Sequence, residues 1–290
     1  DNFEELNSHN INVITFSCEK EAWRKPLLQR LIDNFPPPKY DFVIVCALPK
    51  ESIAYRSIGL DISESKSIQG LDCLDIKLDS LKGLVITCPR MGLVDAAITS
   101  TMALQIFKPK LIAMSGICAG IEGEAEIYDI TIPELCYQHD SGKWTADGFT
   151  PEPYSIQLDH TVKLKIKELI SREGFVNHIL SDISPNRSEI PQHLEKISTS
   201  IKLGILSSGS AVVADENFNK IINMQHRKIA AFEMESYALY EAARLTDFKP
   251  MFFSAKAVVD NGTPGKNDDF HRIACLVSAK TTIEIIKVLL

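Results

Sequence analysis

The feature that most restricts the fold of this chain is a regular alternation of strand-length apolar runs with helical segments, beginning near Tyr40. The run DFVIVCAL at 41–48 is almost continuously apolar and precedes Pro49, which suits the first turn of a helix because its missing N–H needs no partner there. Similar runs occur at 73–78, 83–89, 110–118, 127–138, 202–213 and 251–260. Buried strands separated by helices are typical of an α/β fold with a mixed, mostly parallel central sheet flanked by helices.

Helical spacing of apolar residues predicts helices at 95–107, 158–173, 216–224 and 270–290. Two other stretches have weaker patterns. Residues 140–157 mix Gly, Pro and aromatic residues, and we predict a long ordered loop there. Residues 175–195 are polar without clear periodicity, so we expect them to be flexible.

The first 38 residues contain only one predicted strand and one predicted helix, which alone cannot bury a core. They contain a β-branched run at 12–17 and an amphipathic segment at 19–35, followed by three prolines at 36–38 that form a stiff spacer. We predict that residues 1–38 are an N-terminal arm or the remnant of an upstream, receiver-like regulatory domain, and that residues 39–290 form the main domain. Because the sequence begins without Met, we expect further residues to precede it.

Composition narrows the class of partner. The net charge is −7 and the basic residues are scattered, which argues against nucleic acid or an anionic membrane surface as a ligand and favours a small molecule. No apolar run reaches the roughly 18 residues that a membrane span needs. The seven cysteines include no C-x-x-C pair, and such an odd, unpatterned set fits a reducing cytoplasm.

Motifs for common cofactors are missing from the sequence. It has no phosphate-binding G-x-x-x-x-G-K-[ST] loop, no dinucleotide G-x-G-x-x-G fingerprint, no H-E-x-x-H pair and no G-x-S-x-G elbow. The seven histidines are dispersed without the spacing of metal ligands. We therefore predict neither a metal nor a cofactor.

Polar and glycine residues follow several of the predicted strands, where ligands of α/β sheets bind. They are Glu51, Arg90, the Gly116 to Gly120 run, the Ser208 to Val213 run and Asp260. An acid at the end of a strand is also a common helix cap, so a structural role stays open for each. Because Glu51 and Asp260 follow buried strands at opposite ends of the chain, we expect them to share one pocket.

The segment AAFEMESYALYEAAR, at 230–244, places several chemically useful side chains at one strand-to-helix junction. Its apolar spacing predicts a helix after Phe232, with Glu233 and Glu235 in the first turn. Carboxylates there are stabilised by the helix dipole, so a capping role is the alternative to a functional one.

Six motifs in order carry a resemblance to a known family. They are ALPKES (47–52), RMGLVDAA (90–97), MSGICAGI (114–121), SSGSAVVAD (207–215), AFEMESYAL (231–239) and AKAVVD (255–260). Together they resemble the nucleoside phosphorylase and nucleosidase superfamily, in particular the hydrolytic branch typified by methylthioadenosine/S-adenosylhomocysteine nucleosidase and AMP nucleosidase. The resemblance covers residues 41–290 and implies a purine nucleosidase acting on an adenine nucleoside or nucleotide, including AMP or ATP.

The resemblance also implies roles for individual residues. Glu51 matches the glutamate that activates the attacking water, and Asp260 matches the aspartate that protonates the leaving purine at N7. Such an arrangement is chemically reasonable, because cleavage of an N-glycosidic bond builds positive charge on the ribose and negative charge on the base.

Further positions are implied to bind the substrate. Glu235 would accept hydrogen bonds from the ribose hydroxyls, Met234 would pack on the sugar, and the backbone of Ala211, Val212 and Val213 would read the base edge. The other substrate-binding candidates are Phe232, Glu233, Gly116, Ile117, Cys118, Arg90 and Lys266.

Departures from the family pattern favour water over phosphate as the nucleophile. Phosphorylases of the family carry an Arg before the glycine turn, a hydroxyl within it and an Arg after the first strand, whereas this chain has Met114, Ile117 and the Pro49-Lys50-Glu51 segment there. An apolar Ile117 would leave a phosphate poorly compensated. Phosphorolysis remains the alternative reaction.

The substrate is less well defined by the sequence. Val212 and Ser210 replace the aromatic and the Asp of the usual base-binding motif, which leaves the base contact open. Lys50, Arg56, Arg90 and Lys266 would either meet the phosphates of a nucleotide or be solvated surface charges. A non-catalytic purine-nucleotide sensor is the alternative from another class. The resemblance also implies a homo-oligomer, and by analogy a regulated, nucleotide-depleting antiviral defence effector.

Overall fold

The computed structural model describes residues 39–263 and 268–290. The predictions made for residues 1–38, including the upstream regulatory domain, and for Lys266 lie outside these residues. Within them, no helix combines the length and the apolar character needed to cross a bilayer.

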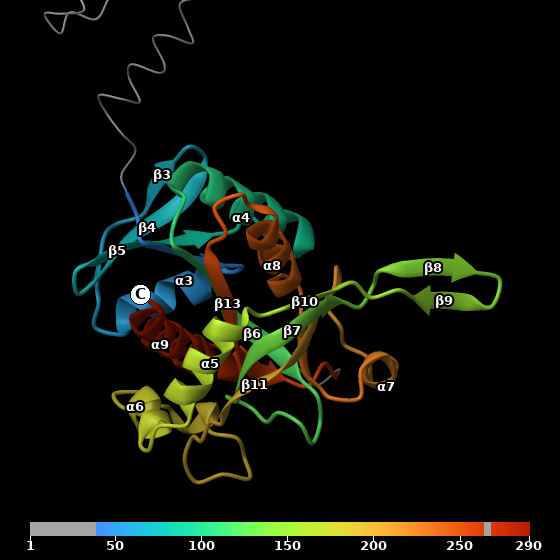
Figure 1. Ribbon diagram of the computed structural model, residues 1–290. Helices are drawn as coiled ribbons and strands as arrows, with labels where there is room; N and C mark the ends of the chain where they lie inside the picture. The colour runs from blue at the N-terminus through green and yellow to red at the C-terminus, as the bar shows by residue number, and fades with distance from the viewer. Residues whose placement is uncertain (1–38, 264–267) are drawn as a thin grey trace, which may run out of the picture. The chain divides into compact units, whose positions relative to one another are not determined.

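A mixed sheet of eleven strands forms the centre of the described chain (Figure 1). Its order is β10-β7-β11-β12-β6-β1-β5-β4-β2, with β13 paired to β6 and β7, and β3 paired to β4. The strands are β1 (Phe42–Cys46), β2 (Asp61–Ile62), β3 (Lys66–Ile68), β4 (Leu71–Leu78), β5 (Leu81–Thr87), β6 (Leu111–Gly120), β7 (Ile130–Gln138), β10 (Ser155–Gln157), β11 (Ile201–Ser208), β12 (Ile229–Glu233) and β13 (Met251–Asp260).

Most of the inner pairings of this sheet are parallel. Strand β1 runs parallel to both β5 and β6, β13 runs parallel to β6 over almost its whole length, and β11 runs parallel to β7 and β12. Antiparallel pairings occur toward the edges and where β12 meets β6 and β13 meets β7. The predicted mixed α/β sheet is therefore confirmed, and β2 and β3 are short additions that the sequence pattern did not indicate.

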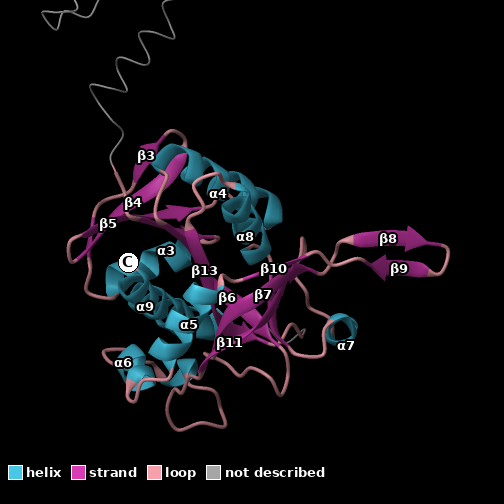
Figure 2. Cartoon of the chain, viewed as in Figure 1, coloured by secondary structure: helices cyan, strands magenta, loops and turns pink. Residues whose placement is uncertain are grey.

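Helices cover both faces of the sheet (Figure 2). Met114 and Ser115 are consecutive in β6 and so point to opposite faces. Met114 Sδ lies 3.9 Å from Ser236 Oγ of α8, whereas Ser115 Oγ lies 2.8 Å from Ser278 Oγ of α9. The helices are α3 (Pro49–Ala54), α4 (Leu93–Phe107), α5 (His160–Ile170), α6 (Phe175–Leu180), α7 (Glu216–Gln225), α8 (Ser236–Leu245) and α9 (His271–Leu289), with short 3₁₀ turns η1 (Tyr55–Ser57), η2 (Arg187–Glu189) and η3 (Asp268–Phe270).

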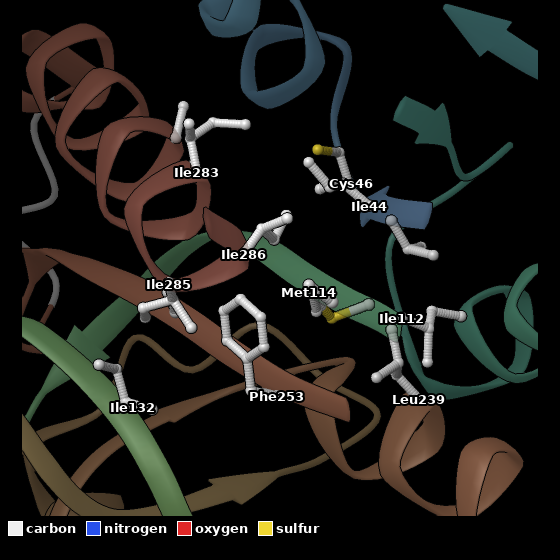
Figure 3. Packing of buried hydrophobic residues seen from close by; sticks show 14 of the residues in the cluster. Ile44, Cys46, Ile112, Met114, Ile132, Leu239, Phe253, Ile283, Ile285 and Ile286 are labelled. Carbon is white, nitrogen blue, oxygen red and sulfur yellow. The ribbon is translucent and has the colours of Figure 1, made fainter. Parts of the chain in front are cut away.

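The main core lies between α9 and the middle of the sheet. Figure 3 shows Ile285 and Ile286 of α9 beside Phe253 of β13, with Leu239 of α8 near Ile112 of β6. All five of these side chains are buried. Burying each large apolar side chain contributes about 1.5–3 kcal/mol, so α9 is held firmly against the strands that end at the pocket described below.

Two predictions made for irregular segments were wrong. Residues 140–157 are not a loop: they contain a hairpin of β8 (Gly142–Thr145) and β9 (Gly148–Pro151), followed by β10. Trp144 and Phe149 face each other across the hairpin with ring centroids 5.4 Å apart, a cross-strand pair that adjacent-residue patterns do not reveal.

Residues 175–195 contain α6 and η2 rather than a flexible stretch. Glu189 of η2 accepts two hydrogen bonds from Arg272 of α9, each 2.6 Å long. A bidentate pair of this kind orients both side chains. Its partners are 83 residues apart, which is why local periodicity did not indicate order here.

Candidate active site

A pocket of about 340 Å³ lies beside the carboxyl ends of β1, β12 and β13. It brings together Glu51 and Asp260, which the sequence places more than 200 positions apart. The other predicted site residues that line it are Ile117, Cys118, Ala211, Val212, Val213, Phe232, Glu233, Met234 and Glu235.

Two of the predicted site residues do not line the pocket. The Arg90 side chain is 83% exposed and its Nε lies 3.7 Å from Asp95 Oδ2. Gly116 lies behind the pocket wall, where its N–H donates to Ser278 Oγ at 2.9 Å. Arg56, an alternative phosphate contact, is instead near Glu64, with 3.6 Å between Nη2 and Oε2.

Glu51 is held in a fixed position by backbone donors. Its Oε2 accepts hydrogen bonds from Ala47 N at 2.8 Å and Leu48 N at 2.9 Å, and its Oε1 accepts from Ile117 N at 3.0 Å. The residue is only 2% exposed. Burial raises the pKa of Glu51 despite the opposing effects of Lys256 and of these backbone donors. A carboxylate that is fixed in position and whose pKa is raised is a better proton acceptor than an exposed one.

Gly116 makes room for that carboxylate. A Cβ atom at this position would lie 2.3 Å from Glu51 Oε1, far inside van der Waals contact. Because Gly116 has no side chain, the Glu51 carboxylate can lie close to the backbone of strand β6.

Glu235 is buried at the N-terminal cap of α8. Its Oε1 accepts from Gly92 N at 2.9 Å, and its Oε2 accepts from Lys256 Nζ at 3.1 Å. Burial raises the pKa of Glu235 to about 7, and the neighbouring charges of Glu233 and Glu51 add to the rise while Lys256 opposes it. Each oxygen retains a lone pair, so the carboxylate has capacity for ligand hydroxyl groups.

Glu233 differs from the prediction that placed it in the first turn of a helix. It is the last residue of β12, and α8 begins only at Ser236. Its carboxylate accepts hydrogen bonds from the backbone N–H groups of Glu235 and Ser236 and from Ser208 Oγ. Although burial opposes the shift, Lys256 and these donors lower the pKa of Glu233. With so many protein donors, Glu233 anchors the β12–α8 junction.

Lys256 is a buried charged residue next to the site that sequence reasoning missed. It lies within β13, is completely buried, and places Nζ 2.8 Å from Glu233 Oε2 and 3.1 Å from Glu235 Oε2. Burial opposes its charge, but Glu233, Glu235 and Glu51 together raise the pKa of Lys256 well above its usual value. A detectable signal existed: a lysine inside an apolar strand is almost never buried unless it is paired.

Asp260 ends β13 and is half-buried at the pocket. Its Oδ1 accepts a hydrogen bond from Gly262 N at 2.7 Å, which closes a tight turn. Gly262 has φ of +70°, and a Cβ there would lie 2.5 Å from Phe232 Cζ. The turn therefore packs on the Phe232 ring and keeps the Asp260 carboxyl next to it.

The wall around Phe232 is apolar. Val213 and Phe218 pack against the small cluster that contains Phe232, and the two phenyl rings have centroids 5.9 Å apart. Val212 is 60% exposed at the rim. An apolar wall next to the Asp260 carboxyl suits a planar heteroaromatic ring with a basic edge.

Lys50 and His271 also line the pocket, and the second of these was not among the predicted residues. Lys50 Nζ lies 2.5 Å from His271 Nδ1, and the same ring nitrogen lies 3.1 Å from Asp268 Oδ1.

Residues 39–263 and 268–290 contain no group of three or more His, Cys, Asp or Glu side chains placed to hold a metal ion.

The family model described as Phosphorylase superfamily matches residues 41–287. The chain is 28% identical over 264 residues to the uncharacterized protein y4jS of Sinorhizobium fredii and 22% identical over 257 residues to the ATP nucleosidase Cap17 of Escherichia coli. These alignments cover 85% and 84% of this chain but only 61% and 50% of those relatives.

Other similar proteins are shorter. The 5'-methylthioadenosine/S-adenosylhomocysteine nucleosidase of Haemophilus influenzae is 22% identical over 247 residues, which cover 85% of this chain and 97% of that protein. Among solved structures, the Helicobacter pylori nucleosidase of that name and the futalosine hydrolase of the same organism superpose with TM-scores of 0.66 and 0.65, each at 18% identity. Both superpositions cover 86% of this chain, with 98% and 97% of the respective neighbours, and they establish a common fold.

Proposed function

The chain belongs to the Phosphorylase superfamily, and on that premise we propose that it is a purine nucleosidase that hydrolyses the N-glycosidic bond of an adenine nucleoside or nucleotide. The observation that carries the proposal is the joint presence of Glu51, Glu235 and Asp260 around one pocket of nucleoside-compatible size. A base, a sugar-binding anion and an acid are what this reaction requires.

The proposed reaction starts with a water molecule beside Glu51. As the bond between ribose C1' and purine N9 lengthens, positive charge develops on the ribose and negative charge on the base. Glu51 takes a proton from the water as its oxygen bonds to C1', and Asp260 donates a proton to N7 of the departing purine. Buried carboxylates close to the sugar favour the positive transition state, since nearby charges interact strongly where water is excluded.

Glu235 and Met234 would hold the ribose. The lone pairs left on the Glu235 carboxylate can accept hydrogen bonds from the 2'- and 3'-hydroxyl groups, while its bonds to Gly92 N and Lys256 Nζ keep it oriented. Met234 lines the pocket directly before it and offers a flexible apolar contact to the sugar.

Hydrolysis fits the pocket better than phosphorolysis. A phosphate nucleophile would need the backbone donors near Glu51, but Ala47 N, Leu48 N and Ile117 N already bind the Glu51 carboxylate. An incoming phosphate would also meet the negative charge of that carboxylate in a buried setting. Water carries no such charge, which favours it as the nucleophile.

The printed names of the relatives agree with this reaction class. Two of the sequence relatives are called nucleosidases of adenine compounds, and one of these is called an ATP nucleosidase. The chain spans about half of that ATP nucleosidase, so the common part supports the activity and not the remainder of that protein.

Three accompanying predictions go with the proposed activity. The described cysteines are buried free thiols, which supports a reducing compartment such as the cytoplasm. Assembly into a homo-oligomer follows from the resemblance and stays a prediction. Control of the activity by a regulatory domain upstream of residue 39, in a nucleotide-depleting defence role, also stays a prediction.

The decisive experiment is product chromatography after incubation of the full chain with adenosine, AMP, ATP, inosine and methylthioadenosine. We expect free purine base and the ribosyl product without added phosphate, and no release by Glu51→Gln protein that melts like the parent. Base release that depends on phosphate would establish a phosphorylase instead. Calorimetric binding of a purine ligand without any product would establish the sensor alternative.

A further inference from the structure

We propose that Lys50 and His271 form an anion-binding site at the sugar end of the pocket, where they take the 5'-phosphate of a purine nucleotide. The substrate class would thereby be a nucleoside 5'-phosphate rather than a free nucleoside. This inference rests on the proposed nucleosidase activity and adds a specificity site to it.

The distribution of charge in the pocket supports this location. The pocket is lined by the carboxyl groups of Glu51, Glu233, Glu235, Asp260 and Asp268, and the buried Lys256 contacts two of them, Glu233 and Glu235. Among the described residues that line the pocket, Lys50 and His271 are the ones whose side chains can carry positive charge. An anionic group on a ligand would therefore be repelled from the catalytic carboxylates and attracted to this pair.

Lys50 and His271 contact each other at the pocket wall. Two basic nitrogens, Lys50 Nζ and His271 Nδ1, lie 2.5 Å apart, so they cannot both be charged at this distance without a cost. Asp268 Oδ1 competes for the same ring nitrogen from 3.1 Å. A phosphate that accepted hydrogen bonds from the Lys50 ammonium would replace His271 Nδ1 as its partner and leave that ring nitrogen to Asp268.

The position of the pair along the pocket fits a 5'-phosphate. Lys50 directly precedes Glu51 in α3, and α3 packs against α9, which begins at His271. With the base beside Asp260 and Phe232 and the ribose hydroxyls on Glu235, we place the C5' arm toward Leu48, Lys50 and His271, which line the pocket together with Asp268.

The orientation of α9 adds to the attraction. His271 is the first residue of this helix of 19 residues, and its cap residue Phe270 makes no side-chain hydrogen bond to the first turn. The N-terminal end of a long helix carries partial positive charge and favours anions. Helix, lysine and imidazole thus act on the same end of the pocket.

Free inorganic phosphate could bind to the same two residues. The experiment therefore distinguishes inorganic phosphate from the 5'-phosphate of a nucleotide. We would measure kcat/KM for AMP and for adenosine by base release, using the full chain, its Lys50→Met variant and its His271→Asn variant. Arg56→Met is the matched control, because Arg56 is a neighbouring cation that does not line the pocket. Melting temperatures would be recorded for all variants.

We expect the ratio of kcat/KM for AMP to that for adenosine to fall about 10-fold to 100-fold in Lys50→Met, the range expected for one charge-assisted hydrogen bond. His271→Asn should lower it in the same direction, and Arg56→Met should leave it unchanged. Inorganic phosphate should inhibit AMP cleavage by the parent protein, and Lys50→Met should be much less sensitive to it.

Three outcomes would overturn the inference. An equal loss for AMP and adenosine in Lys50→Met would assign Lys50 to general stability or catalysis. Adenosine cleaved as well as AMP by the parent protein would show that no phosphate is recognised. Phosphate that accelerates adenosine cleavage would mean that the pair holds a nucleophile. If no base is released from any nucleotide or nucleoside, the proposed nucleosidase activity itself is wrong.

Discussion

Lys256 Nζ lies 2.8 Å from Glu233 Oε2 beneath the pocket, and both side chains are shielded from solvent. The same ammonium lies 3.1 Å from Glu235 Oε2. One lysine thus compensates two buried carboxylates, one that anchors the β12–α8 junction and one that faces the pocket. The arrangement ties the stability of the fold to the orientation of the proposed ribose-binding group.

Replacing this lysine should therefore damage folding as well as activity. Lys256→Met would leave Glu233 and Glu235 buried without a counter-charge, and removal of one partner of a buried ion pair costs about 3–5 kcal/mol. Urea unfolding measures the loss. Lys110→Met is the matched control: its partner Asp41 is 2.9 Å away, but the lysine is 61% exposed, so we expect a loss below about 1 kcal/mol. Similar losses for the two variants would contradict the role assigned to Lys256.

The pH dependence should report the ionisation of Glu235. Because burial raises the pKa of Glu235 to about 7, this carboxyl is mostly protonated and neutral below that pH and mostly ionised above it. Only the ionised form offers full negative charge to the developing cation on the ribose. We therefore expect kcat/KM to rise as the pH increases through about 7, and the rise to be lost in the weakly active Glu235→Gln variant. A flat wild-type profile between about pH 5.5 and 8.5 would argue against this role.

The fold was largely predictable from local patterns. The apolar run at 41–48 with the following Pro49 indicated β1 and the start of α3, and the run at 251–260 indicated β13. Such buried strands are recognisable because nearly every side chain in them is apolar. The β8–β9 hairpin was missed since its defining contact, between Trp144 and Phe149, forms only after the chain turns back on itself.

The sequence predicted the acidic residues of the candidate site better than the basic ones. Strand ends and the FEMES segment indicated Glu51, Glu235 and Asp260, and the pocket brings the three together. The partners of Lys256 are 21 and 23 positions away in the sequence, and those of His271 include a lysine 221 positions away. Pairs of that separation have no periodicity to reveal them, so the charge balance of the site became visible only in three dimensions.

Gly116, which lies against the Glu51 carboxylate, offers a test of how strictly this proposed base must be positioned. Gly116→Ala would put a methyl group 2.3 Å from Glu51 Oε1 and force the carboxylate away from its backbone donors. A displacement of about 1 Å in a catalytic group lowers rates roughly 100-fold, so we expect a loss of at least that size in kcat. Base release by chromatography would measure it.

A second glycine provides the control for that substitution. Gly204→Ala adds a methyl group elsewhere on the same sheet, 3.1 Å from Ala230 Cβ and outside the pocket lining. We expect this variant to retain most of its activity at a somewhat lower melting temperature. If Gly116→Ala kept full activity, Glu51 would not need the position that the structure gives it.

The roles proposed for Glu51 and Asp260 can be separated by the choice of leaving group. A purine must be protonated to depart, whereas 4-nitrophenolate leaves as a stable anion near neutral pH. Asp260→Asn should therefore lose about 10²–10⁴-fold in kcat/KM on a purine nucleotide and much less on a 4-nitrophenyl riboside. Glu51→Gln should lose activity on both substrates, because water must be deprotonated in either case.

These two variants are matched, since each replaces one carboxyl by an amide of the same shape. Nitrophenolate release is followed by absorbance and base release by chromatography, and thermal melting establishes that both proteins are folded. An equal loss on the two substrates in Asp260→Asn would mean that Asp260 shapes the pocket rather than donating a proton. Retention of purine cleavage in that variant would assign the acid to another group, and the half-buried position of Asp260 at the end of β13 would then need a different explanation.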